Sequence, residues 1–68
     1  MTNLGIDQRV RLLRDVPELD LHEGDIGVLC STWFSPHTAY EVEFDRPGLN
    51  MKTRALLLEE QIQPDREN

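Results

Sequence analysis

Cys30 and the two histidines, His22 and His37, are the residues of this sequence whose types most directly suggest catalysis or metal binding. A thiol activated by an imidazole would make Cys30 and His37 a nucleophile and its base. Nothing in the sequence brings the two together, and burial in an apolar strand suppresses the reactivity of a thiol. The histidines stand 15 positions apart without neighbouring thiols, which is not the spacing of a zinc site. We therefore expect no metal and no cofactor, and we expect both histidines on surface loops.

Glu41 and Glu43 are a second candidate, because two carboxyl groups can act as an acid and a base. On one face of a strand they would lie about 7 Å apart. No phosphate-binding loop or other catalytic motif accompanies them. The alternative is structural, with both carboxylates paired across a hairpin to Lys52 and Arg54. We favour the structural interpretation and expect that the protein is not an enzyme.

Trp33 and Phe34 are the stronger functional candidates. They are adjacent in Ser31–Thr38, which the sequence predicts to be a loop broken by Pro36. Two neighbouring aromatic side chains in an extended loop cannot both point inward, so at least one should be partly exposed. Tryptophan is enriched among the residues that dominate protein interfaces. Together with His37 they could supply apolar contact to a partner; the alternative is that Trp33 caps an open end of the fold.

The formal net charge is −6, and the charges are unevenly distributed. From Asp15 to Asp45 there is no Lys or Arg, whereas the basic residues lie before and after this stretch. One interpretation is a mixed, solvated surface; the other is an acidic patch that steers a basic partner. Nucleic acid is disfavoured in both cases, because its affinity comes largely from neutralised phosphates. The candidate steering residues are Glu18, Asp20, Glu23 and Asp25.

The length of 68 residues predicts one domain, with residues 1–6 as a loose lead-in and 65–68 as a polar tail. A chain this short buries only about 60% of the surface of its unfolded form and cannot enclose a deep substrate pocket. Its single cysteine excludes an internal disulfide. No apolar run is long enough for a membrane span, and no signal-peptide pattern is visible. These features favour the cytoplasm, without membrane association.

Five short segments are predicted to be strands: Gln8–Leu13, Ile26–Cys30 after a turn at Gly24 and Asp25, Ala39–Phe44, Met51–Leu58 and Ile62–Gln63. A long loop over residues 15–24, a β-turn at DRPG and one helical or 3₁₀ turn over LEEQ connect them. Five strands with a single turn before the last describe a mainly β fold, a small SH3-like barrel, in which closure hides the sheet edges.

Two segments predict irregularities. Gly27 indicates a bulge, a sharp bend or a close backbone approach, with Ile26, Val28 and Cys30 alternating inward around it. The continuous apolar run Leu56–Leu58 predicts either a bulge or burial on both faces. The expected core consists of Val10, Leu12, Val16, Leu21, Ile26, Val28, Tyr40, Val42, Phe44, Ala55, Leu57 and Ile62.

These residues also resemble a family of small, uncharacterised bacterial domains, a domain of unknown function. The pattern is VRLLRDVPELDLHEGDIGVL, then AYEVEF, then RALLLEEQIQP, from about Val10 to Pro64. The resemblance implies an SH3-like barrel, and some members look like partners of toxin-like proteins. The segment GDIGV also resembles the KOW motif of RNA-binding barrels, but Glu23 and Asp25 replace the basic residues expected there. The landmarks are Asp15, Pro17, Leu21, Gly24, Asp25, Gly27, Tyr40, Glu41, Val42, Glu43, Phe44, Leu57 and Ile62.

The sequence therefore predicts a small acidic, non-catalytic module that binds a protein partner, which would be basic if the acidic residues steer it. An antitoxin-like or immunity-like protein is one concrete form. An accessory subunit of a larger complex is the first alternative, and a KOW-like nucleic-acid-binding barrel, disfavoured by charge, is the second. Association with a second copy of the chain is left open.

Overall fold

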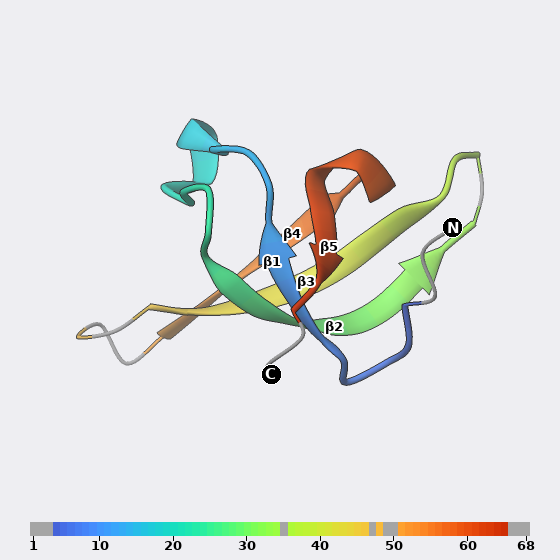
Figure 1. Ribbon diagram of the computed structural model, residues 1–68, viewed down its shortest axis with the longest axis horizontal. Helices are drawn as coiled ribbons and strands as arrows, with labels where there is room; N and C mark the ends of the chain where they lie inside the picture. The colour runs from blue at the N-terminus through green and yellow to red at the C-terminus, as the bar shows by residue number, and fades with distance from the viewer. Residues whose placement is uncertain (1–3, 35, 47, 49–50, 66–68) are drawn as a thin grey trace.

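The fold is a single antiparallel sheet of five strands, seen in a computed structural model that describes residues 4–34, 36–46, 48 and 51–65 (Figure 1). The strand order is β4-β3-β2-β1-β5. Two 3₁₀ turns interrupt the connections, one in the long first loop and one directly before the last strand. The predicted mainly β fold with five strands is confirmed. The elements are β1 (Arg9–Leu12), η1 (Pro17–Leu19), β2 (Ile26–Trp33), β3 (Ala39–Arg46), β4 (Met51–Leu57), η2 (Glu59–Gln61) and β5 (Ile62–Pro64).

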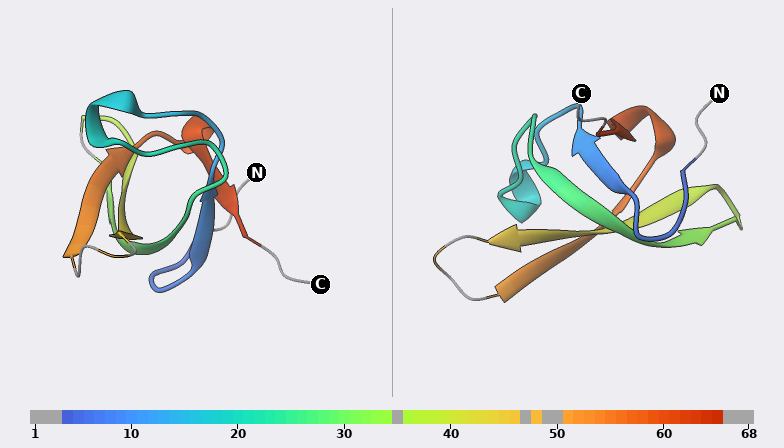
Figure 2. Two further views of the ribbon diagram at one scale, coloured as in Figure 1. Left: turned by 90° about the vertical axis from the view of Figure 1, so that its left-hand side faces the viewer. Right: turned by 60° about the horizontal axis from the view of Figure 1, so that its bottom comes forward.

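The sheet is strongly coiled. The first four strands pair in chain order, and β5 then returns to the free side of β1. Seen end-on, the strands bend round into a rounded outline with the long first loop across one end (Figure 2). This shape is consistent with the SH3-like barrel expected from the sequence. Coiling lets one face of a single sheet enclose a core without a covering helix.

Period-2 alternation places the core. In β3, Tyr40, Val42 and Phe44 are buried, while Glu41 and Glu43 lie on the opposite face, as the sequence predicts. The last strand contributes Ile62, and Leu21 anchors the first loop. The core consists of Val10, Leu12, Leu21, Leu29, Tyr40, Val42, Phe44, Ala55, Leu57 and Ile62, with Leu4 and Val16 packed against it.

The predicted inward face of β2 is wrong. Gly27 and Leu29 point inward, whereas Val28 is 37% exposed and Ile26 and Cys30 are only half-buried. The cause is the small space over Gly27. A Cβ there would lie 2.6 Å from the Val42 side chain, so only glycine fits against β3. The close approach predicted for the glycine is therefore correct, and the hydrophobic alternation around it is out of phase with the core.

A bulge does occur in β2, but three residues after Gly27. Leu29 pairs with Val42 and Ser31 pairs with Glu41, so β2 advances by two residues while β3 advances by one. Cys30 is the extra residue. A bulge of this kind bends the strand and increases its twist, which suits a coiled sheet.

The apolar run in β4 needs no bulge. Its register with β3 is regular from Met51 to Leu57, and Ala55 and Leu57 point into the core. Leu56, between them, is 64% exposed. Both sequence explanations for this run are thus wrong, because the central leucine simply faces solvent.

The long first loop is held by its own polar contacts. Val16 and Leu21 form an isolated bridge around η1, and the Glu23 N–H donates to Asp15 Oδ1 over 2.8 Å. The His22 N–H donates to Asp25 Oδ2 over 2.9 Å, closing the turn into β2. These side-chain and bridge contacts hold the loop in one conformation where it has no regular strand pairing.

The chain ends contribute more than the sequence suggests. Leu4, from the expected lead-in, packs against the core. Asp65, from the expected tail, has a side chain only 5% exposed, held by Arg9 at 3.2 Å and Arg11 at 3.0 Å. In the β3–β4 turn Gly48 has a φ of +85°, the left-handed value expected of it, whereas Pro47, expected to preset φ there, lies outside the described residues.

Candidate partner-binding surface

The outward side of β2, β3 and β4 forms a continuous surface, here called the outer face. Residues paired across an antiparallel sheet point to the same side, so the register defines its members. Trp33 pairs with Ala39, Ser31 pairs with Glu41, and Glu41 pairs with Leu56. The outer face comprises Val28, Cys30, Ser31, Trp33, Ala39, Glu41, Glu43, Asp45, Lys52, Arg54 and Leu56.

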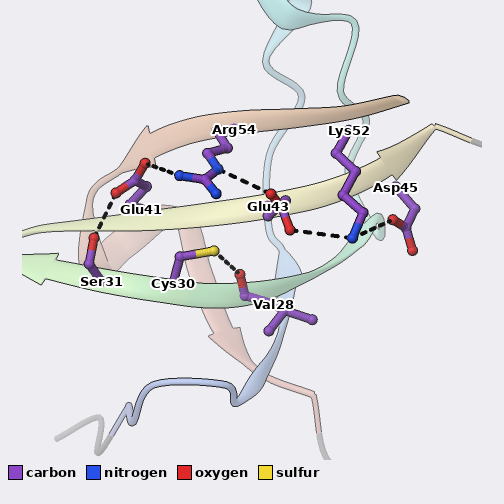
Figure 3. A network of polar contacts seen from close by, with 8 residues as sticks. All are labelled: Val28, Cys30, Ser31, Glu41, Glu43, Asp45, Lys52 and Arg54. Carbon is purple, nitrogen blue, oxygen red and sulfur yellow. Dashed lines mark hydrogen bonds and ion pairs between the residues drawn. The ribbon is translucent and has the colours of Figure 1, made fainter. Parts of the chain in front are cut away.

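The middle of the outer face is a charged network (Figure 3). Arg54 lies between two carboxylates of β3, with Nε 3.1 Å from Glu43 and Nη1 3.4 Å from Glu41. Lys52 Nζ lies 3.6 Å from Glu43 and 3.9 Å from Asp45. Ser31 Oγ donates to Glu41 Oε1 over 2.6 Å. The expected cross-hairpin charge pairs are confirmed.

This network stabilises the ionised carboxylates. The hydrogen bond from Ser31 is the main cause that lowers the pKa of Glu41, assisted by Arg54 and, to a smaller extent, by Trp33. The hydrogen bond from Arg54 is the main cause that lowers the pKa of Glu43. Glu43 in turn raises the pKa of Arg54. Two carboxylates held ionised in this way are poorly suited to an acid–base pair, in which one of the two must hold a proton.

Exposed apolar residues lie at one end of the outer face. We call them the apolar end: Trp33 and Leu56, which belong to the face, and Phe34 and Leu58, which directly follow β2 and β4. Trp33 is 55% exposed and Phe34 is 75% exposed, so Trp33 does not bury itself as a cap on the core. Leu56 and Leu58 are also exposed. Leu56 pairs with Glu41, two residues along β3 from the Ala39 that pairs with Trp33, and Leu58 is the residue after the end of β4. Trp33 belongs to β2 and not to a loop. Its backbone is held in place because it pairs with Ala39.

The four predicted acidic residues lie at the other end of β2. Glu18 is in η1, Asp20 and Glu23 follow it, and Asp25 directly precedes β2. Of these, Asp20 and Asp25 line an open hollow of about 470 Å³. Glu18 and Glu23 are exposed on the same loop, outside the hollow lining.

The structure therefore does not bring the predicted aromatic and acidic residues together. Eight strand steps separate Asp25 from Trp33, a span of about 25 Å. His37, expected beside the aromatics, is exposed in the turn between β2 and β3. Leu56 and Leu58 are exposed residues that sequence reasoning did not assign to the surface. The signal was the uninterrupted apolar run Leu56–Leu58, because a strand buried on one face needs an apolar residue only at every second position.

Part of the acidic middle is also neutralised by the basic residues that follow it. Arg46 Nη2 lies 3.2 Å from Asp20, and Lys52 and Arg54 pair with the carboxylates of β3. The surface is thus mixed on the outer face. Among the acidic residues of the first loop, Glu18 and Glu23 make no ion pair within the described part of the chain.

The described residues hold no cluster of three or more His, Cys, Asp or Glu side chains that could bind a metal ion. The Cys30 thiol sits in the bulge and donates to the Val28 carbonyl over 3.6 Å. No helix in the described ranges is long and apolar enough to cross a bilayer.

A family model described as "Domain of unknown function (DUF4926)" matches residues 7–63. The chain belongs to this family. No curated protein and no solved structure matches it. The DUF4926 match includes β1 to β4, η2 and the start of β5, so the outer face, the apolar end and the hollow all lie within it.

Proposed function

We propose that this DUF4926 domain is a non-catalytic protein-binding module whose partner docks on the apolar end. The observation that carries the proposal is the exposure of Trp33, Phe34, Leu56 and Leu58 at one end of the sheet in a chain of 68 residues. Large apolar side chains gathered at one place on a small domain mark interaction surfaces more often than single exposed ones do.

The backbone supports this role. Trp33 is paired within the sheet, so a partner would meet an aromatic side chain on a strand that is already ordered. Ordering an interface on binding weakens affinity, and a preformed anchor avoids part of that loss. The charged network next to the apolar end supplies a polar rim, the usual surroundings of an interface core.

The finer form of the proposal is an antitoxin-like or immunity-like protein of the bacterial cytoplasm. It is supported by the resemblance noted in the sequence and by the single cysteine, which suits a reducing compartment. The first partner to test is the product of a gene next to the one that encodes this protein. An accessory role in a larger complex would use the same surface and differ only in the size of the assembly.

The test is a binding measurement between the purified protein and the purified product of the neighbouring gene. The variant Trp33→Ala/Phe34→Ala should weaken binding by about 30-fold or more, since one interface hot spot contributes at least about 2 kcal/mol. The control variant Ile6→Ala/Met51→Ala removes two other exposed apolar side chains, outside the apolar end, and should change affinity less than about twofold.

Equal affinities for the wild type and the Trp33/Phe34 variant would refute the apolar end as the docking surface. A gel-shift at low salt covers the nucleic-acid alternative, because electrostatic binding is strongest there. A shifted band that persists in an excess of unlabelled polyanion would favour nucleic-acid binding and contradict the proposal.

A further inference from the structure

The two edges of the sheet are protected to different degrees. The edge strand β5 has three residues and ends at Pro64, and a short strand with a proline is a poor template for further pairing. The other edge strand, β4, has seven residues without a proline and an unbroken register with β3. In both views of Figure 2, β4 lies along the margin of the molecule, with no described segment beyond it. The free side of β4, here called the β4 edge, is therefore open.

The hydrogen bonds of β2 fix the direction in which the backbone groups of the sheet point. The Leu29 N–H donates to the Gln8 carbonyl over 2.9 Å, so the backbone groups of Leu29 point toward β1. Successive residues of a strand direct their N–H and C=O groups to opposite sides. Val28 therefore points toward β3, its partner Glu43 points back toward β2, and the next residue, Phe44, points toward β4.

The same alternation gives the β4 edge three open positions. Thr53 pairs with Phe44, so its backbone groups point toward β3. Lys52, Arg54 and Leu56 consequently turn their N–H and C=O groups to the β4 edge. No hydrogen bond from the described residues reaches these groups. The side chains of the same three residues lie on the outer face, where an added strand would place its own side chains beside them.

The chain itself occupies the next position along the β4 edge. Leu58 follows Leu56 in the same phase, and its N–H donates to Gln61 Oε1 over 2.8 Å. The Leu58 carbonyl accepts the Gln61 N–H over 2.9 Å. Gln61 thus makes the two hydrogen bonds that a residue of an added strand would make, which agrees with the phase derived from β2. A docking strand would pair with Lys52 to Leu56 and end there.

The two cations of the β4 edge are paired on one side only. The ion pairs of Lys52 and Arg54 all reach back to carboxylates of β3. Asp45 stands directly opposite Lys52, and Glu43 stands directly opposite Arg54. The side chains of the two cations remain 58% and 61% exposed, so a second partner can still reach them. A strand added beyond β4 would meet the same cations as β3 does, which favours carboxylates at the matching positions.

A second copy of β4 fits this edge poorly. The antiparallel register that uses all three open positions of both copies would set Arg54 opposite its own counterpart and Lys52 opposite Leu56. Like charges directly opposite each other destabilise a strand pair. Positive side chains on an edge strand also discourage pairing between identical edges. The charges therefore favour a different, acidic strand.

We propose that the β4 edge binds an extended segment of a partner protein as an added antiparallel strand. Acidic side chains of that segment would lie opposite Lys52 and Arg54, and an apolar side chain would lie opposite Leu56. In this mode the main-chain hydrogen bonds supply affinity and the alternate side chains supply specificity. Leu56 also belongs to the apolar end, so one partner can contact both surfaces. The inference rests on the proposed function only for the existence of a partner, since peptide binding to the edge is measurable by itself.

The test uses the ¹⁵N-labelled full chain and the synthetic peptide acetyl-Thr-Leu-Thr-Glu-Thr-Glu-Thr-amide. Its leucine would lie opposite Leu56, and its two glutamates would lie opposite Arg54 and Lys52. Amide chemical shifts should saturate and concentrate at residues 51–57, with a dissociation constant on the order of 1 mM for so short a peptide.

Amide hydrogen exchange reports the backbone pairing directly. In the free protein the amides of Lys52, Arg54 and Leu56 should exchange faster than those of Thr53 and Ala55, which point toward β3. With the peptide at ten times its dissociation constant, exchange at the three open positions should slow by about tenfold, in proportion to the fraction of protein left unbound. Unchanged exchange at saturating peptide would overturn strand addition.

Two altered peptides separate the backbone contribution from the charge. N-methylation of both glutamates removes two N–H donors, keeps both carboxylates and should weaken binding by about tenfold or more. Lysines in place of the glutamates keep the backbone and reverse the charge, and this peptide should give no saturable shifts.

The variant Arg54→Glu replaces an attraction with a repulsion and should weaken binding of the glutamate peptide by about tenfold. The matched control Arg14→Glu makes the same change of charge at an exposed residue away from the β4 edge, and its affinity should stay within about twofold of the wild type. The spectra of both variants without peptide show whether the fold persists, and the altered peptides test the wild type in any case.

Undiminished binding of the N-methylated peptide would overturn the strand pairing, and equal binding of the lysine peptide would overturn the choice of an acidic partner. Slower exchange at the three open positions on concentrating the protein without peptide would assign the β4 edge to a second copy and contradict the proposal. None of these outcomes bears on the Trp33/Phe34 experiment, because neither aromatic residue belongs to the β4 edge. The two proposals therefore fail separately.

Discussion

Gly27→Ala should destabilise the protein by about 3 kcal/mol, the upper end of the range for overpacked cores. The new Cβ would lie 2.6 Å from Val42 Cγ1 and 2.9 Å from both the Glu43 carbonyl oxygen and Phe44 Cδ2. The Glu43 oxygen belongs to the backbone of β3, so relief requires the two strands to separate. The expected stability of a 68-residue domain is about 3–10 kcal/mol, and the substitution would remove a large part of it.

The measurement is urea unfolding followed by far-ultraviolet circular dichroism, together with thermal unfolding. A loss of about 3 kcal/mol corresponds to a melting temperature lower by about 12–24 °C in a domain of this size. Gly5→Ala is the matched control, because no atom lies within 4 Å of the position that its new methyl group would take, and its φ is not left-handed. Gly27→Ala with a stability within about 0.5 kcal/mol of the wild type would refute the close-packing argument.

Two further predictions concern the same strands. Leu29→Ala should cost about 2–5 kcal/mol because the side chain is fully buried, whereas Val28→Ala should stay within about 0.5 kcal/mol; the reverse order in urea unfolding would restore the inward face expected from the sequence. The lowered pKa values of Glu41 and Glu43 mean that the folded state binds fewer protons than the unfolded state, so their stabilising effect is complete above the ordinary pKa of 4.5 and is lost as pH falls below it. Glu41→Gln/Glu43→Gln should therefore flatten the fall in the urea midpoint between about pH 5 and pH 3, and an unchanged slope would show that other carboxylates dominate acid unfolding.

The parts of the fold that follow simple alternation could be predicted from the sequence. In β3 one glutamate separates each apolar residue from the next, so Tyr40, Val42 and Phe44 could be assigned to the core from the sequence. In β2 the residue facing the core is a glycine, which carries no hydrophobic signal, and the flanking Ile26 and Val28 suggested the wrong phase. The decisive fact is the space above Gly27, which depends on the side chains of another strand.

The candidate surfaces were also predictable only in part. Exposure of Trp33 and Phe34 was foreseeable from their adjacency. Their separation from Asp20 and Asp25 was not, because it depends on the length of β2, which runs three residues beyond the predicted end at Cys30. The hollow was also out of reach for sequence reasoning, since it combines the first loop with the end of β3, about 20 positions away along the chain.

The extra residue at Cys30 has a consequence for the meaning of length changes in this strand. In an unbroken strand of the same length, Trp33 would fall on the core side with Gly27 and Leu29, because it stands four residues after Leu29. The bulge instead places it opposite Ala39, on the solvent side. Deleting Cys30 would leave the tryptophan three residues after Leu29, still opposite Ala39 and still facing solvent. A one-residue deletion at this point would therefore remove the bulge and keep the proposed docking surface, so this strand can lose a residue without losing its exposed aromatic.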